Sequence, residues 1–136
     1  MNNPIDIKNM LELSKVIAVV GLSDKPDRDS YHVAAYLQQQ GYKIIPVNPN
    51  AVEILGEKSY SDLTAIKEPV DIVDIFRKPE AVGEIVDQAI QMKAKAVWMQ
   101  EGVVNEEAAQ KASQAGLKVV MNKCMLKEHR RLVAYG

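Results

Sequence analysis

Hydrophobic residues gather in five short runs along the chain, separated by stretches of mixed character. The first run reads V-I-A-V-V-G, the continuous β-branched pattern of a strand that is covered on both faces. The third run, V-D-I-V-D-I-F, alternates with Asp71 and Asp74 and predicts a half-buried strand near a sheet edge. Pro46 falls near the end of the second run, where a missing backbone donor is tolerated. The five predicted strands cover residues 16–21, 42–47, 70–76, 94–99 and 117–121.

Helical spacing appears between these runs. From Pro79 onward, apolar residues recur at i, i+3, i+4 and i+7, which predicts an amphipathic helix. Ser30 and Asn105 are suited to cap helix starts, and Gly41 and Gly116 stand where helices end. Helices are predicted over residues 6–13, 30–40, 79–92, 105–116 and 125–134, with a short one within 59–67.

Alternating strands and helices predict parallel strand pairing, because each helix returns the chain to the same end of the sheet. The expected fold is α/β: a Rossmann-like three-layer sandwich with a five-stranded parallel sheet, formed as a single domain over residues 1–136. In such folds ligands bind beyond the carboxyl ends of the strands, where the strand order reverses. The loops to inspect are therefore residues 21–29, 48–50, 77–79, 100–104 and 122–124.

Composition narrows the function classes. The 136 residues carry 17 Lys and Arg against 18 Asp and Glu, so no overall positive charge favours nucleic acid. Cys124 is the only cysteine, which excludes an internal disulfide and a multi-cysteine zinc site. No apolar run approaches the roughly 20 residues of a membrane span, and the polar start does not resemble a secretory signal. We therefore expect a cytoplasmic protein with no membrane and no nucleic-acid partner.

The first loop reads G-L-S-D-K-P-D-R-D-S and matches neither the dinucleotide fingerprint nor the P-loop. It nevertheless places Gly21, the Ser23 hydroxyl, and the cations Lys25 and Arg28 before a helix whose start is suited to a phosphate. Three aspartates in the same loop outnumber the cations. A phosphate site and a plain solvated loop both remain open on this pattern.

The second loop, V-N-P-N, bears on the cofactor. Nicotinamide-binding folds usually end their second strand with an acidic residue for the ribose hydroxyls, and none is present here. Asn48 can bond a ribose or an adenine edge, although Asn-Pro-Asn is also ordinary turn chemistry. NAD is therefore disfavoured.

Several segments together resemble the small stand-alone CoA-binding proteins, a family similar to the CoA-binding Rossmann domain of the succinyl-CoA synthetase α subunit. They are I-A-V-V-G-L-S, P-x-R, S-Y-x-V, G-Y-K-I-I-P-V-N-P, V-D-I-V-D-I-F-R-K-P-E-A-V, M-Q-E-G-V and M-N-K-C-M-L-K-E-H-R-R-L. The resemblance spans about residues 10–133 and is specific only as a set.

The resemblance implies a ligand, coenzyme A or an acyl-CoA, lying across the strand ends. In the family's pattern, Gly21, Ser23 and Arg28 match the loop that holds the pyrophosphate, and Asn48 and Pro49 match the turn near the adenosine. The implied binding set is Gly21, Leu22, Ser23, Lys25, Arg28, Ser30, Asn48, Pro49, Arg77, Lys78, Pro79 and Gly102.

Two departures from the synthetase pattern limit the resemblance. The synthetase has a lysine soon after the second-strand proline, whereas Asn50 follows here, so the 3′-phosphate needs another partner such as Lys25 or Arg77. The synthetase's second domain and phosphohistidine loop have no counterpart in this sequence, so its ligase chemistry is not expected.

The C-terminal segment offers a weak catalytic alternative. Cys124 and His129 could act as nucleophile and base, but no third orienting group is evident, and packing roles are favoured. His32 is suited to a structural or ligand-edge role, and no metal-ligand spacing is present. The tail also carries a small basic patch, typical of a solvated helix face, although a patch that reached the site could meet a CoA phosphate; its members are Lys127, His129, Arg130 and Arg131.

The sequence is compatible with three functions. The first is a module that binds coenzyme A or an acyl-CoA without chemistry of its own, as a carrier, buffer or sensor. The second is an NAD(P)-dependent Rossmann oxidoreductase, and the third is a regulatory protein-interaction module. The predicted partner is a small nucleotide ligand; the sequence does not indicate the oligomeric state.

Overall fold

A computed structural model describes residues 3–134 and contains a five-stranded sheet in which every pairing is parallel. The strand order is β2-β1-β5-β6-β7, so the sheet extends in both directions from β1. The predicted α/β, Rossmann-like architecture is confirmed. The strands are β1 (Val16–Val20), β2 (Lys43–Val47), β5 (Ile72–Ile75), β6 (Ala96–Met99) and β7 (Lys118–Val120).

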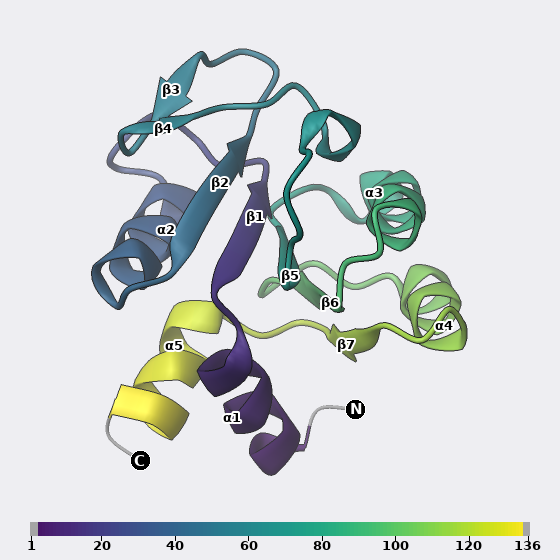
Figure 1. Cartoon of the computed structure of the whole chain (residues 1–136). Coiled ribbons are helices and arrows are strands. Elements are labelled where there is room, and N and C mark those ends of the chain that lie inside the picture. The colour runs from purple at the N-terminus through teal and green to yellow at the C-terminus, as the bar shows by residue number, and fades with distance from the viewer. Residues whose placement is uncertain (1–2, 135–136) are drawn as a thin grey trace.

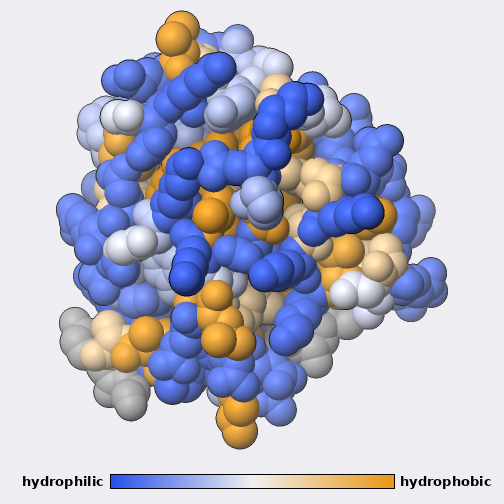
Figure 2. Space-filling view, in the orientation of Figure 1, coloured by the Kyte–Doolittle hydropathy of each residue, from blue (hydrophilic) through white to orange (hydrophobic). Residues whose placement is uncertain are grey.

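Helices cover both faces of this sheet and make three layers. One hydrophobic cluster packs α3 and α4 against the sheet, and a second packs α1, α2 and α5 against the opposite face (Figure 1). The face shown in Figure 2 is mainly hydrophilic with hydrophobic residues interspersed. The helices are α1 (Pro4–Leu13), α2 (Asp29–Gln39), α3 (Pro79–Gln91), α4 (Glu106–Gln114) and α5 (Met125–His129), which continues as a π-helical segment (Arg130–Ala134).

Helix boundaries follow the capping signals at most positions. The side chain of Asn105 accepts a hydrogen bond from the Ala108 N–H at 3.0 Å, as predicted for the start of α4. Gly41 and Gly116 follow the ends of α2 and α4 with φ of +100° and +91°, a conformation that glycine adopts without strain.

The third predicted strand differs from expectation. It forms β5 in the centre of the sheet rather than near an edge, and all four of its residues are buried. The alternation with aspartates was misleading for two reasons. Asp71 precedes β5, where its carboxylate accepts the N–H groups of Lys15 and Val16 at 2.8 and 2.9 Å. Asp74 lies inside the strand and is fully buried.

The segment after β2 also differs from the prediction. The expected helix within residues 59–67 is reduced to a 3₁₀ turn (Leu63–Ala65), and an unpredicted hairpin of β3 (Glu53–Ile54) and β4 (Glu57–Lys58) precedes it. Tyr60 then pairs with the outer edge of β2, since its N–H donates to the Pro46 carbonyl at 3.0 Å. β2 is an outermost strand of the five-stranded sheet, so Pro46 lies on an edge strand, where its missing N–H is tolerated.

Within residues 3–134, no helix combines the length and the apolar character that crossing a bilayer would take.

Candidate functional site

The strand order reverses between β1 and β5, and the loops that follow these strands meet there. The Gly21 N–H donates to the Val47 carbonyl at 3.0 Å, which joins the ends of β1 and β2. The Phe76 N–H donates to the Val20 carbonyl at 2.8 Å, which joins the ends of β5 and β1. Three of the loops singled out by the sequence therefore converge at the carboxyl edge, where ligands of such folds bind.

Gly21 is required at this junction by packing. Its φ is +86°, and a Cβ atom added there would lie 2.2 Å from the Phe76 carbonyl oxygen and 3.0 Å from Arg77 Cδ. No side chain fits in that space. The absence of a side chain thus lets the β1 and β5 loops approach each other closely.

The first loop is held by its own hydrogen bonds. The Ser23 N–H donates to Ser30 Oγ at 2.9 Å, the Lys25 N–H donates to Ser23 Oγ at 3.1 Å, and the Arg28 N–H donates to the Lys25 carbonyl at 3.1 Å. Both serine hydroxyls accept main-chain donors of the loop itself. The amides of Ser23, Lys25 and Arg28 are therefore already engaged.

The prediction that Ser30 caps α2 is wrong. Arg28 occupies the N-cap position with an extended backbone, and Ser30 lies inside the first turn, where it is buried and accepts from Ser23. Arg28 provides no side-chain cap, and within the described part of the chain no side chain caps this helix. The N–H groups of the first turn therefore face outward with the positive end of the helix dipole.

Charges of both signs surround this helix start. Lys25 and Arg28 are exposed, and neither takes part in an ion pair within residues 3–134. Asp24, Asp27 and Asp29 are exposed in the same segment. An anion at the helix start would meet two exposed cations, while the aspartates oppose it unless they turn to solvent.

Asn48 ties the first and second loops together. Its Nδ2 donates to the Leu22 carbonyl at 3.0 Å, and its Oδ1 accepts from the Asn50 N–H at 2.8 Å. Leu22 is fully buried, and its carbonyl is the group that Asn48 holds. Both ends of the Asn48 amide are thus used to position loops, while the neighbouring Pro49 is exposed.

Two cavities flank the first loop on opposite faces of the sheet. The α3 cavity, of about 200 Å³, is lined by Val20, Pro49, Arg77, Asp62 and Glu84, among others. The α5 cavity, of about 390 Å³, is lined by residues of α2, of the loops after β5 and β6, and of the start of α5, including His32, Phe76, Gln100, Cys124 and Lys127. Of the predicted binding residues, Pro49 and Arg77 line the α3 cavity, and none lines the α5 cavity.

Three predicted residues lie farther along the carboxyl edge. Lys78 is the exposed N-cap of α3, and the Pro79 carbonyl accepts from Asn105 Nδ2 at 2.9 Å. The Gly102 N–H donates to Asn122 Oδ1 at 2.8 Å, which ties the β6 loop to the β7 loop. In the described chain none of the three lines either flanking cavity.

A buried acid beneath the α5 cavity was missed from the sequence. Asp74 Oδ1 accepts from Gln100 Nε2 at 2.6 Å, and among residues 3–134 Oδ2 has no partner. Burial raises the pKa of Asp74 to about 7, against the opposing effect of hydrogen bonds from Gln100 and the Ile75 main chain. An aspartate within an otherwise apolar strand is the sequence signal that could have revealed it.

Cys124 and His129 belong to different cavities. Cys124 lines the α5 cavity, whereas His129 lines a cavity of about 350 Å³ beside Tyr42 and Leu11. His129 packs edge-on against Tyr36 and Tyr42, and its Nδ1 lies 2.8 Å from the Tyr36 hydroxyl oxygen. Burial lowers the pKa of His129, which favours the neutral ring. The arrangement indicates a packing role for His129.

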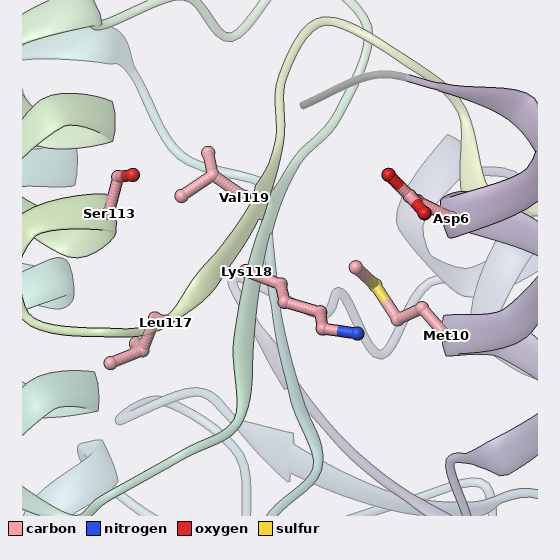
Figure 3. Close-up of a pocket in the computed structure, with 6 residues that line it drawn as sticks. All are labelled: Asp6, Met10, Ser113, Leu117, Lys118 and Val119. Atoms are coloured by element: carbon pink, nitrogen blue, oxygen red, sulfur yellow. The ribbon is translucent and has the colours of Figure 1, made fainter.

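A further cavity of about 400 Å³ lies beside β7, away from the predicted residues. Figure 3 shows Met10 and Asp6 of α1 on one side of β7 and Ser113 of α4 on the other, with Lys118 projecting from the strand toward α1. In the described part of the chain, no group of three or more His, Cys, Asp or Glu side chains is arranged to hold a metal ion.

Comparison with known proteins identifies relatives along nearly the whole chain. A family model described as a CoA binding domain matches residues 15–130. The uncharacterized protein YneT of Bacillus subtilis is 45% identical over 131 residues, which are 95% of this chain and 97% of that protein. A solved structure of a hypothetical protein from Pyrococcus horikoshii OT3 superimposes with a TM-score of 0.93 at 45% identity, covering 96% of this chain and 92% of that one.

An enzyme is a more distant relative. Acetate–CoA ligase (ADP-forming) II of Archaeoglobus fulgidus is 32% identical over 95 residues, which are 68% of this chain. The matched segment spans 14% of that ligase's length.

Proposed function

Because this chain belongs to the family of CoA-binding domains, we propose that it binds coenzyme A or an acyl-CoA at the carboxyl edge of its sheet. The observation that carries the proposal is the start of α2. Its first-turn amides have no side-chain cap in the described structure, and the exposed Arg28 stands at its N-cap. Uncapped amides beside an arginine form a favourable environment for a diphosphate.

The diphosphate is assigned to the first turn of α2 rather than to the amides next to Gly21. The main-chain N–H groups of Gly21, Ser23 and Lys25 already donate hydrogen bonds within the protein. The first-turn N–H groups of α2 have no side-chain cap among the described residues and remain available to a ligand. Arg28 supplies the charge-assisted bond, and Lys25 a second cation. Ser23 and Ser30 hold the loop in shape through their hydroxyls.

The adenosine part is assigned to the α3 cavity. Pro49 and Arg77 line it, and Asn48 fixes the loop that carries Pro49. Arg77 lies against Gly21 and can direct its guanidinium to the 3′-phosphate, since Asn50 stands where the synthetase pattern has a lysine. The proposed binding set is Gly21, Leu22, Ser23, Lys25, Arg28, Ser30, Asn48, Pro49 and Arg77, with Lys78, Pro79 and Gly102 farther along the edge.

The proposal is confined to binding, by a single domain over residues 1–136 that acts as a carrier, buffer or sensor. The segment shared with the ligase covers 14% of that enzyme, so its whole reaction is not proposed for this chain. Retention of a CoA thioester during purification without added ligand, detected by mass spectrometry, would identify the acyl group.

Thermal denaturation with candidate nucleotides tests the ligand class. A ligand at 100 times its dissociation constant adds about 2.7 kcal/mol, which raises the melting temperature of a domain this size by several degrees. We expect that shift with CoA and not with NAD or NADP. A shift with NADP alone would favour the oxidoreductase, and none with any nucleotide would favour a protein-interaction module.

Replacing Arg28 tests the assigned phosphate contact. A hydrogen bond to a charged group contributes about 1.5–3 kcal/mol, so Arg28→Ala should weaken CoA binding at least tenfold in calorimetry. The unfolding free energy should change little because Arg28 is exposed. Arg131→Ala, which removes an exposed arginine paired with Glu128, is the matched control and should bind normally. Equal affinity of the Arg28 variant and wild type would remove Arg28 from the site.

A further inference from the structure

The Asp74 carboxyl is an unusual group to find in the middle of a parallel sheet. It stands in register with Val19 of β1 and Trp98 of β6, and it is 0% exposed. Only Oδ1 has a side-chain partner, the Nε2 of Gln100 at 2.6 Å, while Oδ2 has none among residues 3–134. Buried polar atoms are nearly always paired, so an unpaired carboxyl oxygen calls for an explanation.

Gln100 connects this carboxyl to the α5 cavity. It is only 3% exposed, yet it lines that cavity, whose walls include the apolar Val33, Phe76 and Leu126. Because Gln100 Nε2 donates to Asp74, the carboxamide oxygen Oε1 is the atom of this side chain that can accept a hydrogen bond from a ligand in the cavity. The cavity thus combines apolar wall residues with a buried hydrogen-bond acceptor, Gln100 Oε1, whose orientation is fixed by Asp74.

The charge on Asp74 decides which end of that amide turns inward. An ionised carboxylate only accepts hydrogen bonds, so it holds the Gln100 NH₂ inward and leaves Oε1 for the cavity. A protonated carboxyl donates, and its best acceptor is Oε1, so the amide turns over and presents NH₂ instead. The two protonation states of one buried acid therefore give the cavity opposite hydrogen-bonding character.

We propose that Asp74 is a positioning residue which, through Gln100, makes the α5 cavity an acceptor site for an amide N–H of the pantetheine arm of bound CoA. This inference rests on the proposed function, since it assigns the arm that extends beyond the diphosphate. An N–H donor at Oε1 favours the ionised carboxylate, so binding releases a proton. Affinity for CoA should therefore rise as the pH rises through neutrality.

Other charged groups face the same cavity and must be separated from Asp74. Lys127 pairs with Glu101 at 3.0 Å, and both are exposed. The residues beside Asp74 on β1 and β6 are uncharged. The remaining polar or charged groups lining the cavity are Asp29 and His32 on α2 and Cys124 at the start of α5. His32 is the histidine that lines this cavity, so His32→Gln belongs in the test.

Calorimetric titration between pH 5.5 and 8.5 tests the proposal with two probes: CoA, and adenosine 3′,5′-bisphosphate, which lacks the pantetheine arm. For wild-type protein, CoA affinity should rise by up to about tenfold per pH unit below neutrality and level off above pH 8, relative to Asp74→Asn. With the bisphosphate, wild type and variant should show the same pH dependence. The phosphates of the ligand also change charge over this pH range, but their effect is the same for both proteins and disappears from the difference between wild type and variant.

Control variants separate the possible failures. His32→Gln and the exposed Asp87→Asn should keep the wild-type pH dependence, and Gln100→Met should lose it while retaining Asp74. Gln100→Met also serves if Asp74→Asn does not fold. If wild type and both Asp74 and Gln100 variants bind CoA with the same pH dependence, the positioning role is wrong and the proposed function stands. If CoA does not bind wild type at any pH, both proposals fail.

Discussion

Replacing Asp74 by asparagine should change how the stability of the protein depends on pH. In the folded protein the pKa of Asp74 is about 7, because burial disfavours the charge, whereas its ordinary value is 3.8. Between these values the folded state holds a proton that the unfolded state has lost. The stabilisation from this difference is complete below pH 4 and disappears as the pH rises through 7.

The magnitude follows from the size of the shift. Each pKa unit corresponds to about 1.4 kcal/mol, so the stabilisation lost between pH 5 and pH 8, as Asp74 ionises in the folded protein, is about 3 kcal/mol. The asparagine of the variant does not titrate, and its buried NH₂ in place of Oδ2 costs about 1–3 kcal/mol at every pH. Wild type should therefore be the more stable protein at pH 5, and the variant should equal or exceed it at pH 8.

Urea unfolding of both proteins at pH 5, 6, 7 and 8 measures this difference directly. All other titrating groups are common to the two proteins, so the difference between their unfolding free energies isolates Asp74. A difference that stays constant within about 0.5 kcal/mol from pH 5 to pH 8 would refute the reasoning. It would mean that Asp74 remains in one protonation state over this range.

Two more stability predictions follow from the loops and the strand ends. Gly21→Ala should cost more than about 3 kcal/mol, since its Cβ would collide with the Phe76 carbonyl, whereas Gly102→Ala, with open space and a φ of +83°, should cost only about 1–2 kcal/mol. Equal losses in urea unfolding would contradict the packing role. For Asp71, burial raises the pKa, but the N–H groups of Lys15 and Val16 together with the Lys95 ammonium outweigh burial, and the pKa is lowered. Asp71→Ala should therefore cost about 1–3 kcal/mol at pH 7, and the loss should shrink as the pH falls below 4, as unfolding at pH 7 and pH 3 will show.

Hydrophobic spacing predicted the architecture because the buried faces of this fold are nearly all apolar. The run from Val16 to Val20 and the helix from Pro79 were recognised within a residue or two. The spacing failed where polar groups are satisfied in unexpected ways. Asp71 caps the chain before β1, and Asp74 is buried, so an apparent surface alternation belongs to the central strand.

The site was predicted less completely than the fold. Loop positions followed from the strand ends, and the loops that carry Gly21, Asn48 and Arg77 lie together at the carboxyl edge. The binding roles of their side chains stay predictions. What those side chains do depends on tertiary contacts that no local pattern encodes. Ser30 was expected to cap a helix but accepts from Ser23, because the N-cap of α2 is Arg28. Nothing in the local sequence distinguishes Gln100, because its role depends on the hydrogen bond to Asp74, 26 residues away.

The hydrogen bonds inside the first loop also affect the thermodynamics of ligand binding. The Ser23 and Ser30 hydroxyls accept main-chain N–H groups of the same loop and so restrain residues 23–30 before any ligand binds. Fixing the backbone of a flexible segment costs about 1–2 kcal/mol of conformational entropy per residue. Folding has already met part of that cost here, so an arriving ligand has less chain to order and loses less affinity to loop ordering.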